Sequence, residues 1–374
     1  MKAEASAVVS GIGRSEIGRR LGRDPLRLTA DAALAALADA GLAAADIDGV
    51  STYPGATGST PGISGAGVDE VRALLGLKLR WHTGGGELAG QLGSIVNAVL
   101  AVAAGVCEHV LCFRTVWEST AQVEVGSRSS LVVGSQRDVM QWGRPYGVGY
   151  ATFDALSMQR YMHESGATRA QLAQLAVVSR ANAARNPHAI YRKPMTVDEY
   201  LDARMISDPL CLYDCDVPVD GAIAVVVSRA GSTAIDARKA VRIEAMGSAS
   251  GFQASADMLW SRTDLVPADV DVAEIYDGFS IYAVHWLEAL RLIPRNETGA
   301  FIEGGHRIAL DGELPVSTGG GQLSGGRLHG YGGLLEACVQ LRGEGGERQV
   351  PNEPRVAAVS SGAENFTSCL LLTR

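Results

Sequence analysis

The sequence predicts an α/β protein built from two similar halves, each with mainly parallel strands covered by helices. Apolar strand-like runs alternate with helical segments along the chain, which is typical of that class. A glycine-rich segment occurs twice, as Thr-Gly-Gly-Gly-Glu-Leu-Ala-Gly at 83–90 and Thr-Gly-Gly-Gly-Gln-Leu-Ser-Gly at 318–325. Upstream of these copies, 45–53 and 268–276 share an Ala-Asp start and a terminal Tyr. The order strand, glycine-rich turn, helix, strand therefore occurs twice and indicates an internal duplication.

The first half begins with a strand and a helix that local signals define well. Residues 7–13 form an apolar run that predicts a buried strand. Residues 24–41 predict an amphipathic helix, with Asp24 as its N-cap and Pro25 in its first turn. Gly41 follows the last helical position, where a left-handed residue commonly ends a helix.

The segments after the two glycine-rich turns correspond to each other. Residues 94–105 and 334–343 predict helices that end in glycine. The apolar runs at 109–113 and 355–361 then predict buried strands. Each turn is therefore expected to connect a strand to a helix, with another strand after the helix.

Two domains are expected, 1–231 and 232–374, with the boundary in a polar joint. Strands are predicted on both sides of that joint, at 222–229 and 241–247. Residues 115–205 contain polar helices and aromatic loops without a counterpart in the second half. We interpret them as a loop subdomain inserted over the site.

Composition excludes several classes of protein. The 374 residues include 45 glycines, about 12% of the chain, which is well above the usual ~7%. The net charge of −8 argues against a nucleic-acid-binding surface. No apolar run reaches the ~18 residues that a membrane span needs, and the N-terminus lacks the apolar stretch of a signal peptide. We therefore expect a cytoplasmic protein without a membrane span.

The six cysteines are scattered and lie mostly in apolar runs, which predicts buried, reduced thiols. Cys211 and Cys215 are not followed by a second Cys/His pair at zinc-site spacing, so no metal site is expected. The segment 11–18 (GIGRSEIG) lacks the third glycine of a dinucleotide fingerprint. The P-loop motif and the GxSxG nucleophile elbow are absent from the sequence.

The glycine-rich turns are candidate parts of a site. A glycine-rich turn before a helix presents backbone N–H groups at the positive end of the helix dipole. Such groups can bind a carbonyl oxygen or an oxyanion, and Gly85, Gly86, Gly320 and Gly321 are the candidates. The alternative is that glycine only allows a helix to approach a sheet closely. Two copies at equivalent places favour a pocket shared between the halves.

Polar residues follow the second turn on a glycine-rich loop. Arg327, His329 and Tyr331 bring a cation, an imidazole and a phenol into five positions, a density of chemistry that suggests a site. The alternative is a solvated or packed loop. Tyr276 ends a predicted strand, and polar residues at that position face a cleft in open α/β sheets.

Four other polar residues have simpler interpretations. We interpret Asp277, which follows Tyr276, as the N-cap of the next helix. His285 is expected to be packed in the interior. Asp216 and Asp220 lie in an acidic run without EF-hand spacing, and turn or joint roles are expected for both.

These motifs resemble the thiolase superfamily over nearly the whole chain, and in particular its sterol-carrier-protein-type, or lipid-transfer-protein, thiolase-like group. The resemblance rests on the duplication, on RYMHESGATRAQLAQLAVVSRANA, on DCDVPVDGAIAVVV, on YDGFS and on TGGGQLSGG. It implies a thiolase fold, with two βαβαβαββ halves in α-β-α-β-α layers. It also implies a homodimer formed through the strand near 109–114.

The catalytic groups of thiolases are exchanged in this sequence. Leu88 stands where the resemblance places the nucleophilic cysteine, and 83–93 contain no Cys, so acyl transfer through a thiol is excluded. Arg327 stands near the family's active-site His. The late catalytic Cys region corresponds to Ser360, Ser361 and Gly362, of which Ser360 and Gly362 are candidate substrate-binding positions, together with Leu88.

The missing Cys and Tyr276 resemble the thiolase-like aldolases of steroid side-chain degradation. The resemblance implies retro-aldol cleavage of a β-hydroxyacyl-CoA to a ketone and a shorter acyl-CoA. It also implies a small OB-fold partner with a zinc ribbon, and zinc is expected only in that partner. CoA is part of the substrate, and no separate cofactor is expected.

Retro-aldol cleavage needs a base but no covalent nucleophile. Tyr276 is the candidate base, and Arg327, His329 or Tyr331 would assist it or protonate the enolate. Backbone donors would stabilise the enolate oxygen. Two alternatives stay open, namely a Cys-independent acyltransferase and a non-catalytic subunit that binds acyl-CoA or lipid.

Overall fold

The computed structural model describes residues 2–55, 62–85, 90–124, 141–364 and 366–374. Leu88 and Gly86 lie outside the described residues. The first half contains, in chain order, β1 (Ala7–Arg14), α1 (Pro25–Ala40), β2 (Gly49–Thr52), α2 (Val68–Leu75), β3 (Trp81–Gly84), α3 (Gly93–Ala103), β4 (His109–Trp117), α4 (Glu118–Glu124), α6 (Tyr150–Ser165), α7 (Arg169–Ala184), α8 (Val197–Leu201), β5 (Met205–Ser207), β6 (Leu210–Cys211) and β7 (Asp220–Arg229). The second half contains β8 (Val241–Ala249), α9 (Phe252–Trp260), β9 (Val272–Glu274), α10 (Ser280–Ala289), α11 (Thr298–Phe301), a π-turn (Gly321–Gly325), α12 (Tyr331–Arg342), β10 (Val356–Ala363) and β11 (Phe366–Thr373).

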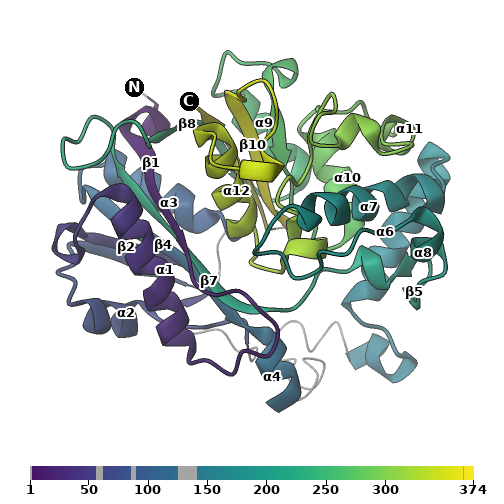
Figure 1. Cartoon of the computed structure of the whole chain (residues 1–374), viewed down its shortest axis with the longest axis horizontal. Helices are drawn as coiled ribbons and strands as arrows, with labels where there is room; N and C mark the ends of the chain where they lie inside the picture. Colours follow the sequence, from purple (N-terminus) through teal and green to yellow (C-terminus); the bar gives the residue numbers. More distant parts are fainter. Residues whose placement is uncertain (1, 56–61, 86–89, 125–140, 365) are drawn as a thin grey trace.

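In the described part of the chain, nine strands pair in the order β3-β2-β4-β7-β1-β8-β11-β10-β9, so that each half contributes a contiguous set (Figure 1). Among the described strands, the two sets pair with each other where β1 meets β8, through Val8–Arg242 and Val9–Val241. In the second half, an isolated parallel bridge between Ala273 and Val316 stands where the first half has β3. The predicted duplication is therefore visible in the sheet.

The expectation of mainly parallel sheets is wrong. The parallel pairs are β2–β3, β2–β4 and β9–β10, and the other neighbours are antiparallel. Alternating helices and strands in the sequence do not show which strands become neighbours. Ala363 pairs with Phe366 at the end of β10 and β11, and antiparallel strands can be joined by so short a connection without a crossover helix.

The expected α-β-α-β-α layering is confirmed by the alternation of buried residues along the strands. In β7, Ala222, Ala224 and Val226 pack with α1 and α2, whereas Ile223 and Val225 point to the opposite side. That opposite side contains α3 and α12, which pack between the two sets of strands in one hydrophobic core. On the far side of the second set, α9 and α10 form the outer layer.

Helix α1 forms as predicted. The Asp24 carboxylate accepts the Leu26 N–H at 2.9 Å, and Gly41 ends the helix with φ 75°. At Gly13 a Cβ would lie 2.4 Å from the Ala32 carbonyl oxygen, so glycine lets α1 pack directly on β1.

The strand expected at a dimer interface, near 109–114, lies inside the sheet. It is part of β4, which pairs with β2 on one side and β7 on the other. Its backbone N–H and C=O groups are therefore already hydrogen-bonded to β2 and β7. A second copy of the chain could add a strand only at an edge of the sheet. The edge strand of the first half is β3.

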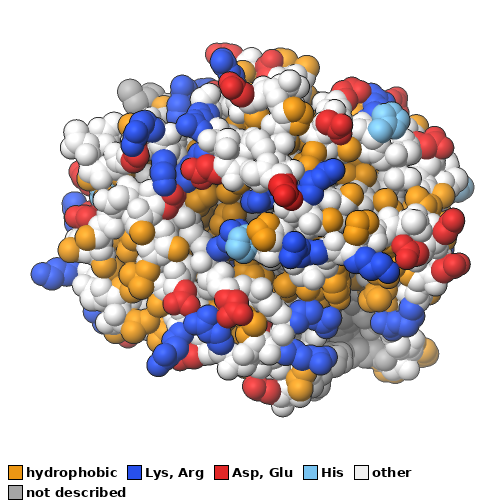
Figure 2. Space-filling model, in the orientation of Figure 1, with side chains coloured by type: hydrophobic (Ala, Val, Ile, Leu, Met, Phe, Trp, Pro, Cys, Tyr) orange, Lys and Arg blue, Asp and Glu red, His pale blue; other side chains and the backbone are white. Residues whose placement is uncertain are grey.

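The segment interpreted as an insertion packs against the second glycine-rich turn. Ser179 of α7 donates to the Gly320 carbonyl oxygen at 2.5 Å, and the Asn182 amide donates to the Val316 carbonyl oxygen at 3.1 Å. The surface in Figure 2 is hollowed near its centre, and acidic and basic side chains are interspersed around the hollow. Within the described ranges, no helix combines the length and apolar character needed to cross a membrane.

Candidate active site

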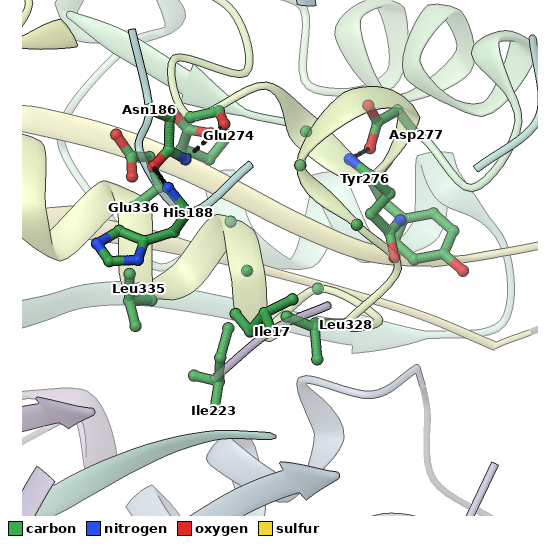
Figure 3. A pocket seen from close by; sticks show the side chains of 18 of the residues that line it. Ile17, Asn186, His188, Ile223, Glu274, Tyr276, Asp277, Leu328, Leu335 and Glu336 are labelled. Atoms are coloured by element: carbon green, nitrogen blue, oxygen red, sulfur yellow. Dashed lines mark hydrogen bonds between the residues drawn. The ribbon is translucent and has the colours of Figure 1, made fainter. Parts of the chain in front are cut away.

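A cavity of about 70 Å³, partly open to solvent, lies at the second glycine-rich turn. Tyr276 and Asp277 lie at one end, and Glu274, Glu336 and His188 lie at the other (Figure 3). None of the residues that line it is a cysteine. Among the residues that the structure describes, no group of three or more His, Cys, Asp or Glu side chains could hold a metal ion.

Tyr276 follows β9 and is 9% exposed. Its N–H donates to Ser360 Oγ of β10 at 2.9 Å, so the predicted position Ser360 holds the backbone of the candidate base. Burial raises the pKa of Tyr276, Asp216 raises it further, and Arg327 lowers it. The hydroxyl is therefore neutral in the free protein and needs a positive environment to act as a base.

The insertion helps to position the ring of Tyr276. The ring stacks on Tyr282 of α10, with centroids 6.2 Å apart and planes at 26°. The Tyr282 hydroxyl donates to Asp154 of α6. Burial raises the pKa of Asp154 to about 6. A helix of the insertion thus fixes the aromatic neighbour of the candidate base.

The interpretation of Asp277 as an N-cap is wrong. Helix α10 has Phe279 at its N-cap, without a side-chain capping bond. The Asp277 carboxylate instead accepts the N–H groups of Gln322 (2.8 Å) and Leu323 (3.3 Å). Burial raises the pKa of Asp277 to about 7, against these two hydrogen bonds, which lower it. A Cβ at Gly321 would lie 2.1 Å from Asp277, so the contact needs glycine there.

Arg327 bridges two buried carboxylates. It binds Asp216 at 2.9 Å and also forms an ion pair with Glu118 at the start of α4. The side chains of Glu118 and Asp216 are 0% and 8% exposed. Asp216 therefore has an ion-pair role, rather than the turn role expected for it. Asp220 does have the expected joint role, because it accepts the Leu21 N–H at 2.8 Å and the Thr120 N–H at 3.0 Å.

His329 contacts a buried arginine that sequence analysis missed. Its Nδ1 lies 3.1 Å from Arg114 Nη2, and because Arg can only donate, Nε2 carries the ring proton. Arg114 also donates to the Tyr53 carbonyl oxygen at 3.0 Å. Burial lowers the pKa of Arg114 to about 10. A charged residue inside the apolar run HVLCFRTVW was the signal that could have identified it.

The backbone at His329 is left-handed, with φ 51°, an uncommon conformation for a residue with a side chain that is found at functional sites. His285, by contrast, is packed as predicted, with Nε2 2.9 Å from Ser157 Oγ.

The structure does not bring Tyr331 to the cavity. Tyr331 starts α12, is 0% exposed, and lies in the core between the two sets of strands. Its hydroxyl lies 2.5 Å from Ser94 Oγ of α3. Burial raises the pKa of Tyr331 well above its usual range. The predicted phenol of the second loop therefore packs two central helices together.

The two candidate glycines of the second turn differ in their position and hydrogen bonding. Gly321 lines the cavity, but the Gly320 N–H donates to the Ser317 carbonyl oxygen at 2.9 Å. That N–H is therefore already engaged and does not fit the predicted oxyanion role.

Near the first turn, the Gly362 carbonyl oxygen accepts the indole N–H of Trp286 at 3.0 Å. A Cβ at Gly362 would lie 3.2 Å from the Cα of Gly90. The end of the first turn thus meets β10 of the second half, as a shared pocket requires. Gly85 is partly buried and has open space where a Cβ would be.

The other end of the cavity contains two buried carboxyl groups that sequence analysis missed. Glu336 binds Arg348 at 2.8 Å. The Thr318 hydroxyl lies 2.6 Å from Glu274 Oε1 and 3.2 Å from Glu336 Oε1. Burial raises the pKa of Glu274 well above its usual range, and Glu336 raises it further. Both effects favour the protonated form of Glu274.

Comparison with known proteins relates the chain to two enzymes over almost its whole length. It is 34% identical over 361 residues to the "17-hydroxy-3-oxo-4-pregnene-20-carboxyl-CoA lyase" of Mycobacterium tuberculosis, which covers 90% of this chain and 92% of that protein. It is 31% identical over 391 residues to the "Steroid side-chain-cleaving aldolase" of Thermomonospora curvata, which covers 98% and 97%. A family model described as "Thiolase C-terminal domain-like" matches residues 232–372.

Solved structures agree with these relatives. A structure described as "Ltp2-ChsH2(DUF35) aldolase" matches 99% of this chain and 98% of that chain, with a TM-score of 0.86 and 30% identity. The acetyl-CoA acetyltransferase of Syntrophomonas wolfei matches 99% of both chains with a TM-score of 0.67 and 17% identity, a likeness of fold alone.

Proposed function

Because the chain belongs to the thiolase superfamily, in the lipid-transfer-protein thiolase-like group that includes the steroid side-chain-cleaving aldolases, we propose that it cleaves a β-hydroxyacyl-CoA with a steroid-type side chain. The products are a ketone and a shorter acyl-CoA. The observation that carries this proposal is the buried phenol of Tyr276, which lies in a cavity without a cysteine and near Arg327.

The cleavage breaks the Cα–Cβ bond and, overall, replaces the proton on the β-hydroxyl group by a proton on Cα. Tyr276, as the phenolate, takes the proton of the β-hydroxyl group, and the oxygen left behind forms the carbonyl group of the ketone. The Cα–Cβ bond breaks, and its electrons form an enolate whose charge lies on the thioester oxygen. Protonation of Cα then gives the shorter acyl-CoA. No group is oxidised or reduced overall.

Arg327 supports the base role of Tyr276 by electrostatics. A neighbouring cation favours the charged form of an acid, and Arg327 lowers the pKa of Tyr276, against the larger effects of burial and of Asp216. A substrate that displaces water from the cavity would strengthen this attraction. The Nε2 atom of His329, which carries the ring proton, lies 3.9 Å from Glu118 Oε1.

We further propose that the active assembly contains a homodimer of this chain and a small OB-fold partner with a zinc ribbon. Support for a partner comes from the solved relative described as "Ltp2-ChsH2(DUF35) aldolase". Support for strand pairing between two copies comes from the edge position of β3.

The direct test of the function is a product assay. The purified chain, with and without its partner, is incubated with a steroid-type β-hydroxyacyl-CoA, and ketone and shortened CoA ester are measured by mass spectrometry. We expect equal amounts of both products. Acyl transfer without ketone would favour a Cys-independent acyltransferase, and absence of turnover in both samples would contradict an aldolase.

The pH dependence follows from the direction of the Tyr276 pKa. A base acts when deprotonated, and the pKa of Tyr276 is raised above its usual value near ~10. We therefore expect kcat/KM to rise about tenfold per pH unit from pH 7 to pH 9, without a plateau. A rate that is flat or falls over this range would remove Tyr276 as the base.

A further inference from the structure

The side chain of Gln322 lies in the cavity beside the candidate base. Gln322 belongs to the π-turn (Gly321–Gly325), is 6% exposed, and lines the cavity together with Tyr276 and Ser360. It also contacts the Tyr276 hydroxyl closely enough to lower the pKa of that group. The π-turn is held by Asp277, which accepts the Gln322 N–H at 2.8 Å, so the backbone beneath this side chain is fixed.

The orientation of the Gln322 amide is set by His329. The His329 N–H donates to Gln322 Oε1 at 2.9 Å, and because a backbone N–H can only donate, the oxygen must occupy that side. Nε2 therefore points the other way. It is buried, it lies on the side of the Tyr276 hydroxyl, whose pKa the amide lowers, and it forms no hydrogen bond of ordinary geometry with the residues that the structure describes.

A buried amide donor without an acceptor costs about 1–3 kcal/mol, and native proteins retain few such groups. In Gln322, Oε1 accepts the His329 N–H, whereas the Nε2 amino group lies in the cavity without such a bond to the described residues. We propose, on the basis of the aldolase function, that Gln322 Nε2 donates to the thioester oxygen of the substrate. The bond strengthens when the Cα–Cβ electron pair moves onto that oxygen as the enolate forms.

This donor fits the chemistry better than a second cation would. The enolate must be stabilised when it forms but protonated at Cα afterwards, and a neutral, preoriented donor does the first without trapping the anion as an ion pair. Arg327 is already engaged by Glu118 and Asp216. Gln322 thus supplies an oxyanion donor instead of the Gly320 N–H, which already donates to the Ser317 carbonyl oxygen.

Substitution can separate the two functions of the amide. Gln322→Glu keeps an oxygen that accepts the His329 N–H but replaces the open NH2 group by an acceptor. Gln322→Met removes both groups at similar volume. Gln171→Glu is the matched control, because Gln171 forms the capping box of α7 and Glu serves equally in that motif.

The experiment measures enolate formation without the ketone. Propionyl-CoA is incubated with the full chain in D2O, and exchange of its Cα protons is followed by NMR at several concentrations. We expect exchange by the unsubstituted protein. The maximal rate should fall about 10²–10³-fold in Gln322→Glu and Gln322→Met, with less than a threefold change in half-saturating concentration. Gln171→Glu should retain the original rate.

The outcomes separate this inference from the proposed function. Exchange by the original protein together with an undiminished rate in Gln322→Glu overturns the role of Gln322 and leaves the aldolase proposal standing. Absence of exchange by the original protein overturns both. If Gln322→Met fails to fold, as judged by its melting temperature, Gln322→Glu decides, because it retains the bond to His329.

Discussion

Replacing Tyr276 by Phe is expected to lower kcat for ketone release by about 10²–10⁴-fold, the usual contribution of a positioned acid or base. The substitution removes one oxygen and keeps the ring that stacks on Tyr282. The backbone bond from Tyr276 N–H to Ser360 Oγ is also kept. The melting temperature should therefore stay close to that of the original protein, so the loss can be assigned to chemistry.

Tyr161→Phe is the matched control for this variant. Tyr161 is 4% exposed and donates to Glu288 at 2.8 Å, but it does not line the cavity. Its loss should reduce stability slightly and leave kcat within about twofold. Turnover by Tyr276→Phe at the original rate would exclude Tyr276 from proton transfer.

Replacing Arg327 by Met is expected to destabilise the fold by about 3–5 kcal/mol, the usual cost of removing one partner from a buried ion pair. The two carboxylates that Arg327 bridges, Glu118 and Asp216, are almost fully buried. Neither can regain full hydration when the guanidinium is removed. Urea unfolding should show a lower midpoint with an unchanged slope, because the surface exposed on unfolding stays the same.

Two further variants test the cause of that loss. Arg238→Met removes an ion pair with Asp236 in which Arg238 is 89% exposed, and it should cost less than about 1 kcal/mol. Adding Glu118→Gln to Arg327→Met should recover part of the stability, because one buried charge that has lost its arginine is then removed. A double variant no more stable than Arg327→Met would contradict the electrostatic explanation.

The elements that could be predicted are those with local signals. Helix α1 carries its own N-cap in Asp24 and its own end signal in Gly41, and the structure has both. The buried strands were recognisable because each is a short apolar run. The antiparallel strand β11 was not predicted as an element, although it too is a short apolar run with Leu370, Leu371 and Leu372 at its core.

The candidate site was predicted in part, because only some of its residues carry a local sequence signal. Tyr276 was found because it ends a strand, and Arg327 and His329 because they lie among glycines. Arg114 and Glu118 come from the first half, and they are buried partners of those two residues. Such partners are more than two hundred positions away in the sequence, so no local pattern reports the contact.

The sequence by itself determined the duplication, the α/β class and the place of Tyr276 at the end of a strand, because these follow from residue type and spacing. The resemblance to the thiolase superfamily added the order of the layers and the absence of the thiolase cysteine. Only the tertiary structure decided what each polar group contacts. Tyr331 packs in the core against Ser94, and Asp277 accepts a hydrogen bond from the π-turn. Nε2 of Gln322 forms no hydrogen bond of ordinary geometry with the described residues. The physical reason is that burial and hydrogen-bond partners are set by how the two halves and the insertion pack around α12.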